Sequence, residues 1–303
     1  MKSPHLAALT LLGIFTLGVP ARAATLQTYF DFTTYGTVAG GSSITSSAYG
    51  VSSTSATVKS AATALTSTGL SITAGTDGGT TGVSMAASTL TGYTGDFSLQ
   101  IWYTSPATIE ANTALYGGTT TASADGNLTG DQALFTVYNG AKDRIRPIVG
   151  NNSKYGFDSN NNIPSGTGAS LNTLYDYVVT YSMATSTFTV YMDGVQVGTT
   201  FSVPYFTGLN GLTSGFAIGG VENAAFGSDN TAGVNINSFM MYTGALDAST
   251  VSSLHSLGSN PNGSQFQSIG IAAVPEPQVI ALILTAGLFG MVKVFARRRH
   301  LVA

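Results

Sequence analysis

The sequence predicts an all-β protein, an antiparallel β-sandwich flanked by a signal peptide and one membrane helix. Three observations support this prediction. Apolar and polar residues alternate with a period of two in many short runs, clusters of Gly, Asn, Asp and Ser separate these runs, and the long apolar stretches lie at the two ends of the 303-residue chain. Period-two runs divided by turn residues are typical of the strands of a sandwich.

The first 23 residues have the pattern of a secretory signal peptide. Lys2 precedes an apolar run at residues 6–19, and Ala21 and Ala23 form an A-x-A cleavage site. We expect cleavage after Ala23. About 14 apolar residues are too few to span a bilayer comfortably, which disfavours a membrane anchor here.

Residues 24–258 are predicted to form the sandwich. The clearest strand is residues 96–103, whose alternation predicts one buried and one exposed face. The two faces consist of Phe97, Leu99, Ile101 and Tyr103 and of Ser98, Gln100 and Trp102. Asp193 and Gly194 favour a two-residue hairpin turn between residues 187–192 and 195–197. Further strands are expected at residues 27–32, 69–73, 133–138, 144–149, 175–181, 216–219 and 236–242.

One segment of the body has a helical pattern, residues 246–257. Asp247 is a suitable N-cap, and Val251, Leu254 and Leu257 share one face. Residues 259–273 are expected to be a linker to the C-terminal segment.

The C-terminal segment, residues 274–303, contains an apolar stretch at 279–296 that ends at Arg297, Arg298 and Arg299. This stretch is long enough to cross a bilayer if Lys293 reaches the headgroups, and the arginines favour a cytoplasmic C-terminus. The sequence therefore predicts one transmembrane helix.

The motif Pro275-Glu276-Pro277 precedes this helix. A Pro-Glu-Pro motif followed by a single membrane span and a basic C-terminus resembles the PEP-CTERM sorting signal. The resemblance implies a Gram-negative bacterium, an exosortase-type membrane protease as partner, and transient membrane anchoring followed by release to the cell surface or extracellular matrix. An ordinary permanent anchor is the alternative.

Four segments of the body, in chain order, resemble a laminin-G-type domain (LamG) of the concanavalin A-like superfamily. They are DFSLQIW from Asp96, YVVTY from Tyr177, FTVYMDGV from Phe188 and INSFMMY from Ile236. The resemblance implies a jelly roll of about twelve to fourteen strands in two packed sheets, with ligands held on the concave face or by rim loops.

The chain departs from that family at several polar positions. Leu174, Tyr175 and Asp176 stand where the family usually has Trp and two His, and Asn237 replaces the usual acid of the last strand. The resemblance therefore implies the scaffold and no inherited polar site.

Composition excludes several classes of protein. Residues 24–277 hold five basic and fourteen acidic residues, a net charge of −9, so nucleic-acid binding is not expected. The absence of cysteine excludes thiol catalysis, cysteine-ligated zinc and iron–sulfur clusters.

Catalytic residues are not predicted. Glycoside hydrolysis usually needs a pair of carboxylates, and before the tail the body has only two glutamates, Glu110 and Glu222, neither in a Glu-x-Asp-x-x-Glu strand. His255 lies on the predicted helix, where an exposed or capping role is expected. No Gly-x-Ser-x-Gly elbow is present.

The sequence favours calcium over other metals. No pattern in the sequence requires a cofactor. Asp125, Asn127 and Asp131 place three side-chain oxygens within seven residues, and residues 158–162 form a second oxygen-rich segment. Asp and Asn also bond their own backbone in turns, which is the alternative for both segments.

Exposed aromatic rings beside polar groups are candidates for carbohydrate binding. Two pairs lie in loop-like segments, Tyr155 with Phe157 and Tyr205 with Phe206. Packing into the core is the alternative for each pair, since most aromatic side chains are buried.

The sequence favours an exported, non-catalytic surface or matrix protein that binds extracellular polysaccharide or a surface protein. Two alternatives stay open: a polysaccharide-degrading enzyme, either glycosidase or lyase, with an unrecognised carboxylate pair, and a structural matrix protein without a specific ligand. All three are compatible with the predicted scaffold, because fold alone does not determine function.

Overall fold

A computed structural model describes the central part of the chain. The residues described are 24–47, 49, 53–59, 63–73, 81–107, 113–119, 133–139, 144–151, 153–158, 162–168, 170–204, 206–220 and 233–272. The predicted signal peptide with its cleavage residues Ala21 and Ala23, the motif Pro275-Glu276-Pro277 and the apolar stretch 279–296 lie outside these ranges. Among the residues described, no helix is both long and apolar enough to cross a bilayer.

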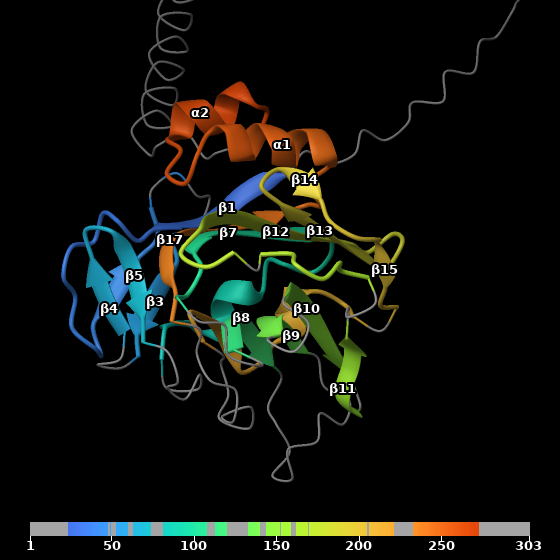
Figure 1. Cartoon of the computed structure of the whole chain (residues 1–303), viewed down its shortest axis with the longest axis horizontal. Helices are drawn as coiled ribbons and strands as arrows, with labels where there is room; N and C mark the ends of the chain where they lie inside the picture. The colour runs from blue at the N-terminus through green and yellow to red at the C-terminus, as the bar shows by residue number, and fades with distance from the viewer. Residues whose placement is uncertain are drawn as a thin grey trace, which may run out of the picture.

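Two antiparallel sheets pack face to face, which confirms the predicted all-β sandwich (Figure 1). Sheet A has nine strands. Its path is β14 (Val195–Gln196), β13 (Thr187–Met192), β12 (Leu174–Ser182), β7 (Phe97–Thr104), β17 (Asn235–Thr243), β5 (Gly69–Ile72) and β4 (Thr63–Thr66), with β1 (Thr25–Asp31) paired to β17 and β15 (Phe201–Ser202) paired to β13.

Sheet B has eight strands. Its order is β11 (Ser153–Asp158), β10 (Arg144–Asn151), β9 (Ala133–Asn139), β8 (Thr113–Thr119), β16 (Gly215–Ile218), β6 (Val83–Met85), β3 (Ser55–Val58) and β2 (Ser43–Thr45). The part of the chain that the structure describes also includes two short 3₁₀ helices, η1 (Ala87–Leu90) and η3 (Leu209–Gly211).

The core between the sheets is built from alternate residues of their strands. Tyr116 of β8 meets Phe239 of β17 across the sandwich, with 5.5 Å between ring centroids. From β7, Phe97, Leu99, Ile101 and Tyr103 all point into this core, as the alternation predicts. The hairpin also forms as predicted, since Asp193 and Gly194 have φ values of 51° and 79°.

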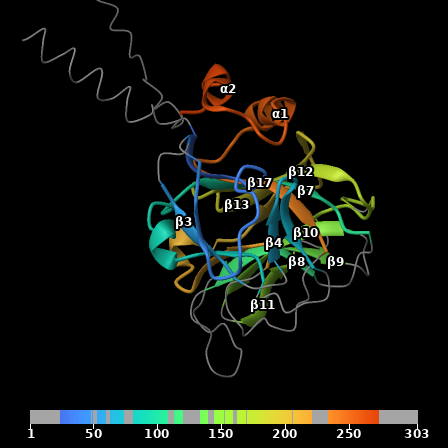
Figure 2. The same cartoon turned by 90° about the vertical axis from the view of Figure 1, so that its left-hand side faces the viewer.

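Helices α1 (Ala248–Ser256) and α2 (Gly263–Ser268) lie on the face of sheet A that points away from sheet B (Figures 1 and 2). The predicted N-cap is confirmed, because the Asp247 side chain accepts a hydrogen bond from the Thr250 backbone N–H. Leu254 of α1 and Phe266 of α2 pack with Trp102 and Val178 of the sheet in a second apolar cluster.

This helical cover corrects two predictions. The strand at residues 97–104 is not half-buried, because its outward residues Ser98, Gln100 and Trp102 lie beneath the helices and are 0 to 6% exposed. Residues 259–272 are not a linker, because α2 docks through Phe266, and the Leu26 backbone N–H donates to the Ala272 carbonyl oxygen. The packed body therefore extends beyond residue 258.

Candidate functional site

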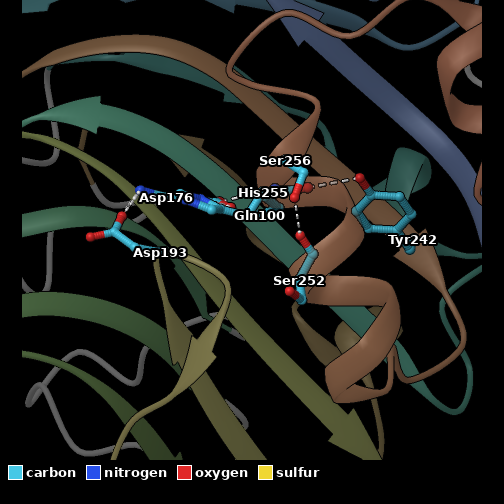
Figure 3. Close-up of polar contacts among 7 residues, drawn as sticks. All are labelled: Gln100, Asp176, Asp193, Tyr242, Ser252, His255 and Ser256. Atoms are coloured by element: carbon cyan, nitrogen blue, oxygen red, sulfur yellow. Dashed lines mark hydrogen bonds and ion pairs between the residues drawn. The ribbon is translucent and has the colours of Figure 1, made fainter.

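Two polar places are prominent in the part of the chain that the structure describes. The first, here called the capped cluster, lies between sheet A and α1 and contains Gln100, Asp176, Tyr242 and His255 (Figure 3). The second, here called the end cavity, is a hollow at the end of β1, β7 and β17. Both are built on sheet A.

The capped cluster is a chain of hydrogen bonds. The Tyr242 hydroxyl donates to Gln100 Oε1 at 2.9 Å, Gln100 Nε2 donates to Asp176 Oδ1 at 2.9 Å, and His255 Nδ1 lies 3.3 Å from Asp176 Oδ2. The three sheet residues come from outward positions of β7, β12 and β17, and His255 comes from α1 (Figure 3). These strands thus carry buried polar side chains on a covered face, which also holds Ser98, Thr180 and Ser238 beside its apolar residues.

Burial and neighbouring charges shift the pKa values of Asp176 and His255 in this cluster. Asp176 is 0% exposed, and burial raises the pKa of its carboxyl, although hydrogen bonds from His255 and Gln100 oppose the effect. The hydrogen bond with Asp176 raises the pKa of the His255 imidazole. Asp193 adds negative charge nearby, and its side chain accepts a hydrogen bond from the Asp176 backbone N–H at 2.9 Å.

The His255 ring is held on two sides. It stacks on Trp102 with 5.4 Å between centroids and 2° between planes, and a Cβ added to Gly194 would lie 3.0 Å from His255 Cβ. A His–Asp pair has the composition of a general base. A buried carboxylate at Nδ1 is also how a catalytic imidazole is oriented. Here, however, the hydroxyl of the neighbouring Ser256 donates to the Ser252 carbonyl oxygen and not to the imidazole, and the contacts of His255 with Asp176 and Trp102 join α1 to the sheet. The geometry fits a role in holding α1 on the sheet.

The end cavity has a volume of about 320 Å³. Its lining is polar or without side chains, and consists of Gln27, Gly92, Thr94, Gly95, Asp96, Thr243 and Gly244. Asp96 Oδ1 accepts a hydrogen bond from the Met183 backbone N–H at 2.6 Å, and Gln27 Nε2 donates to Thr243 Oγ1 at 3.1 Å. These bonds order the polar side chains around an open hollow. Ordinary ligand pockets are lined mainly by apolar side chains, whereas a ligand in this hollow would be held by hydrogen bonds.

The predicted calcium residues are not placed by the structure. Asp125, Asn127 and Asp131 all lie outside the described ranges. Within those ranges, no three His, Cys, Asp or Glu side chains gather closely enough to hold a metal ion. The calcium site stays a prediction.

The structure describes three of the four aromatic residues that were predicted to bind carbohydrate. Tyr155 and Phe157 lie on β11, an edge strand of sheet B, and not in a loop. Tyr205 is outside the described residues. Phe206 is 2% exposed and packs on Tyr181 and Phe188, with 5.3 and 5.4 Å between ring centroids, so the prediction of an exposed platform at Phe206 is wrong.

Sequence reasoning missed both polar places. Asp176 was noted only as a departure from a family pattern, and Asp96 only as the start of a strand. One signal was present for the capped cluster: Gln100 and Asp176 interrupt strands whose other residues are mostly apolar. The end cavity has no such signal, because its lining comes from three separate parts of the chain.

Comparisons with known proteins agree with this architecture. Residues 77–252 match the Laminin_G_3 family, described as the concanavalin A-like lectin/glucanases superfamily. Among curated proteins, no match was found.

Solved structures with similar folds include a sialidase. Trypanosoma rangeli sialidase has a TM-score of 0.51 at 20% identity, over 76% of this chain and 32% of the sialidase. Its complex with 2,3-difluorosialic acid has a TM-score of 0.50 at 19% identity, over 77% of this chain and 32% of that one. Domain 4 of the arabinanase AbnA from Geobacillus stearothermophilus, solved with arabinotriose, has a TM-score of 0.48 at 16% identity, over 77% and 99% of the two chains. The chain thus spans about a third of the sialidases' length.

Proposed function

The chain belongs to the Laminin_G_3 family of the concanavalin A-like lectin/glucanases superfamily, and from this premise we propose that it is an exported, non-catalytic protein that binds carbohydrate at the cell surface or in the extracellular matrix. The observation that carries the proposal is the end cavity. It offers amide, hydroxyl and carboxylate groups to a ligand but contains one carboxylate, Asp96, in place of the pair that glycoside hydrolysis uses.

The destination of the protein is part of the proposal. The signal peptide ending at Ala23 leads to export, and the motif Pro275-Glu276-Pro277 with the apolar stretch 279–296 presents the protein to an exosortase-type protease. The intact mass of the protein from the cell surface and medium tests this. A species from Ala24 to about Pro277 supports processing, whereas a species that retains residues 279–303 means a permanent anchor.

Binding is tested with the exopolysaccharide of the producing cell. We expect the purified protein to be retained on the immobilised polymer and to saturate. Absence of retention contradicts carbohydrate binding, and retention without saturation favours a structural matrix protein.

The enzymatic alternative makes a separate prediction. A polysaccharide-degrading enzyme releases new reducing or unsaturated chain ends, and the release stops when its essential aspartates are changed to asparagine. We expect the protein to leave a broad glycan panel unchanged. Release of products by the wild-type protein, lost in an Asp→Asn variant, would overturn the non-catalytic proposal.

A further inference from the structure

The end cavity is lined by two glycines that the fold does not require. A Cβ added to Gly92 meets no atom within 4 Å, and one added to Gly95 meets only the Met183 sulfur at 4.0 Å. Neither residue has the positive φ that favours glycine. Gly244, on the same lining, differs: its φ is 96° and an added Cβ would lie 3.1 Å from Ala24 Cα. Backbone geometry and packing thus favour glycine at position 244 but do not require it at positions 92 and 95.

Glycine permits a ligand to come close to the main chain, because it has no side chain. Both residues line the end cavity together with Asp96, so a large side chain at either position would stand at the cavity wall. At these two positions the cavity wall is bare main chain, which a ligand can approach.

The lining selects a class of ligand. Among the lining residues that the structure describes, none is basic, and the carboxylate of Asp96 is exposed to solvent. A carboxylate, sulfate or phosphate on the ligand would be repelled by Asp96 and would find no opposite charge. None of the lining residues is aromatic either, so affinity must come from hydrogen bonds and not from stacking on a ring.

The hydrogen-bonding groups in the lining of the end cavity are suited to bond the hydroxyl groups of a ligand. Oδ1 of Asp96 is used by the Met183 N–H, and a carboxylate has lone pairs on two oxygens for further donors. Gln27 and Thr243 bond each other through one donor and one acceptor, which leaves the Gln27 carbonyl oxygen and the Thr243 hydroxyl hydrogen to face a ligand. The volume of about 320 Å³ lies at the lower limit of ordinary ligand pockets, about 300 Å³, which suits the end of a glycan chain better than its interior.

We propose that the end cavity binds the terminal residue of a neutral glycan, with the Asp96 carboxylate accepting hydrogen bonds from its hydroxyls and with Gly92 and Gly95 giving it room. This inference rests on the proposed carbohydrate-binding function and names the ligand class and the site. Recognition is direct, without a bridging metal ion.

The test uses the full chain, purified in detergent, on an array of neutral oligosaccharides ending in glucose, galactose, mannose or arabinose and their uronic acid counterparts. Gly92→Phe places a large ring at the cavity wall, where an added Cβ meets no atom within 4 Å, and Ser252→Phe puts the same ring on the exposed face of α1 as the control. Asp96→Asn keeps an oxygen for the Met183 N–H and removes the charge. Thermal unfolding monitors the fold of each variant.

We expect neutral glycans to bind and uronic acids not to bind. Gly92→Phe should weaken binding at least tenfold and Asp96→Asn about tenfold, the usual effect of losing a hydrogen bond to a charged group, while Ser252→Phe should have no effect. Gly92→Ala should fall between the wild-type protein and Gly92→Phe. These results would support the site and its ligand class.

Three results would overturn the inference. Stronger binding of uronic acids refutes the neutral class, and loss of binding when EDTA removes calcium refutes direct recognition. Equal retention of wild-type protein and Gly92→Phe on the exopolysaccharide refutes the site but leaves the proposed function intact. If the wild-type protein binds neither the array nor the exopolysaccharide, the proposed function itself fails.

Discussion

Sheet A carries two aspartates in opposite surroundings. Asp176 lies on its outer face, is 0% exposed, and has hydrogen bonds to Gln100 and His255 beneath α1. Asp96 lies at the end of the same sheet, is exposed, and faces a cavity. The same type of side chain thus holds a helix on the sheet in one place and is open to solvent in the other, and the covering helix makes the difference.

The largest expected difference concerns stability. Asp176→Ala leaves the buried Gln100 amide and the His255 ring without their acceptor, and should lower the free energy of unfolding by about 3 kcal/mol or more. Asp96→Ala removes an exposed acceptor that water can replace, and should cost about 1 kcal/mol or less. Urea unfolding of both variants measures this. Equal losses would contradict the division into a capped and an open site.

A smaller loss of stability is expected at the hairpin turn of Asp193 and Gly194, which lies against α1. Gly194 has a positive φ and an added Cβ would lie 3.0 Å from His255 Cβ, a tight contact, whereas Gly36 has a positive φ of 65° and nothing within 4 Å. Gly36→Ala should cost about 1 kcal/mol from backbone strain alone, and Gly194→Ala about 2 kcal/mol or more. The difference between the two unfolding free energies isolates the contact with His255. Identical losses would mean that the turn does not support the helix.

The smallest effect is the dependence of stability on pH. Asp176 raises the pKa of His255 above its ordinary value of 6.5, so the stabilisation from the imidazolium is fully present below pH 6.5 and is lost as pH rises through the raised pKa. Burial raises the pKa of Asp176, which makes stability fall with rising pH in the acidic range as well. The free energy of unfolding should therefore decline from pH 6 to pH 8.

His255→Gln provides the control for this slope. The variant keeps a polar side chain at the position but has no group that titrates near neutral pH. We expect the slope between pH 6 and pH 8 to flatten in His255→Gln and to remain in Asp96→Asn. A slope that persists unchanged in His255→Gln would place its origin outside the capped cluster.

Much of the fold could be predicted from sequence because the decisive signals are local. The strand at residues 187–192, the Asp193–Gly194 turn and the N-cap Asp247 depend on neighbours in the chain, and each was predicted at its observed place. Strands β6, β8, β11 and β15 were not predicted, nor were β2, β3 and β4. The last three illustrate the reason. They are three or four residues long and rich in Ser and Thr, and their conformation is stabilised by pairing with other strands.

The candidate sites were predicted less well, for the same reason. Phe206 follows Pro204 in a segment that reads as a loop, yet its ring fills the core beside Tyr181 and Phe188. Gln27, Asp96 and Thr243 are far apart in sequence and meet only because β1, β7 and β17 end together. A residue's exposure depends on what packs over it, and no local pattern records that.

The sequence by itself determined the class of fold, the alternation that divides each strand into two faces, and the position of the helix, because these follow from the geometry of one chain segment. Only the tertiary structure decided that α1 and α2 bury the outer face of sheet A, that Asp176 is enclosed, and that Asp96 stays open beside Gly92 and Gly95. The physical reason is that burial and cavities are properties of several segments packed together, and the sequence of any one of them does not contain the others.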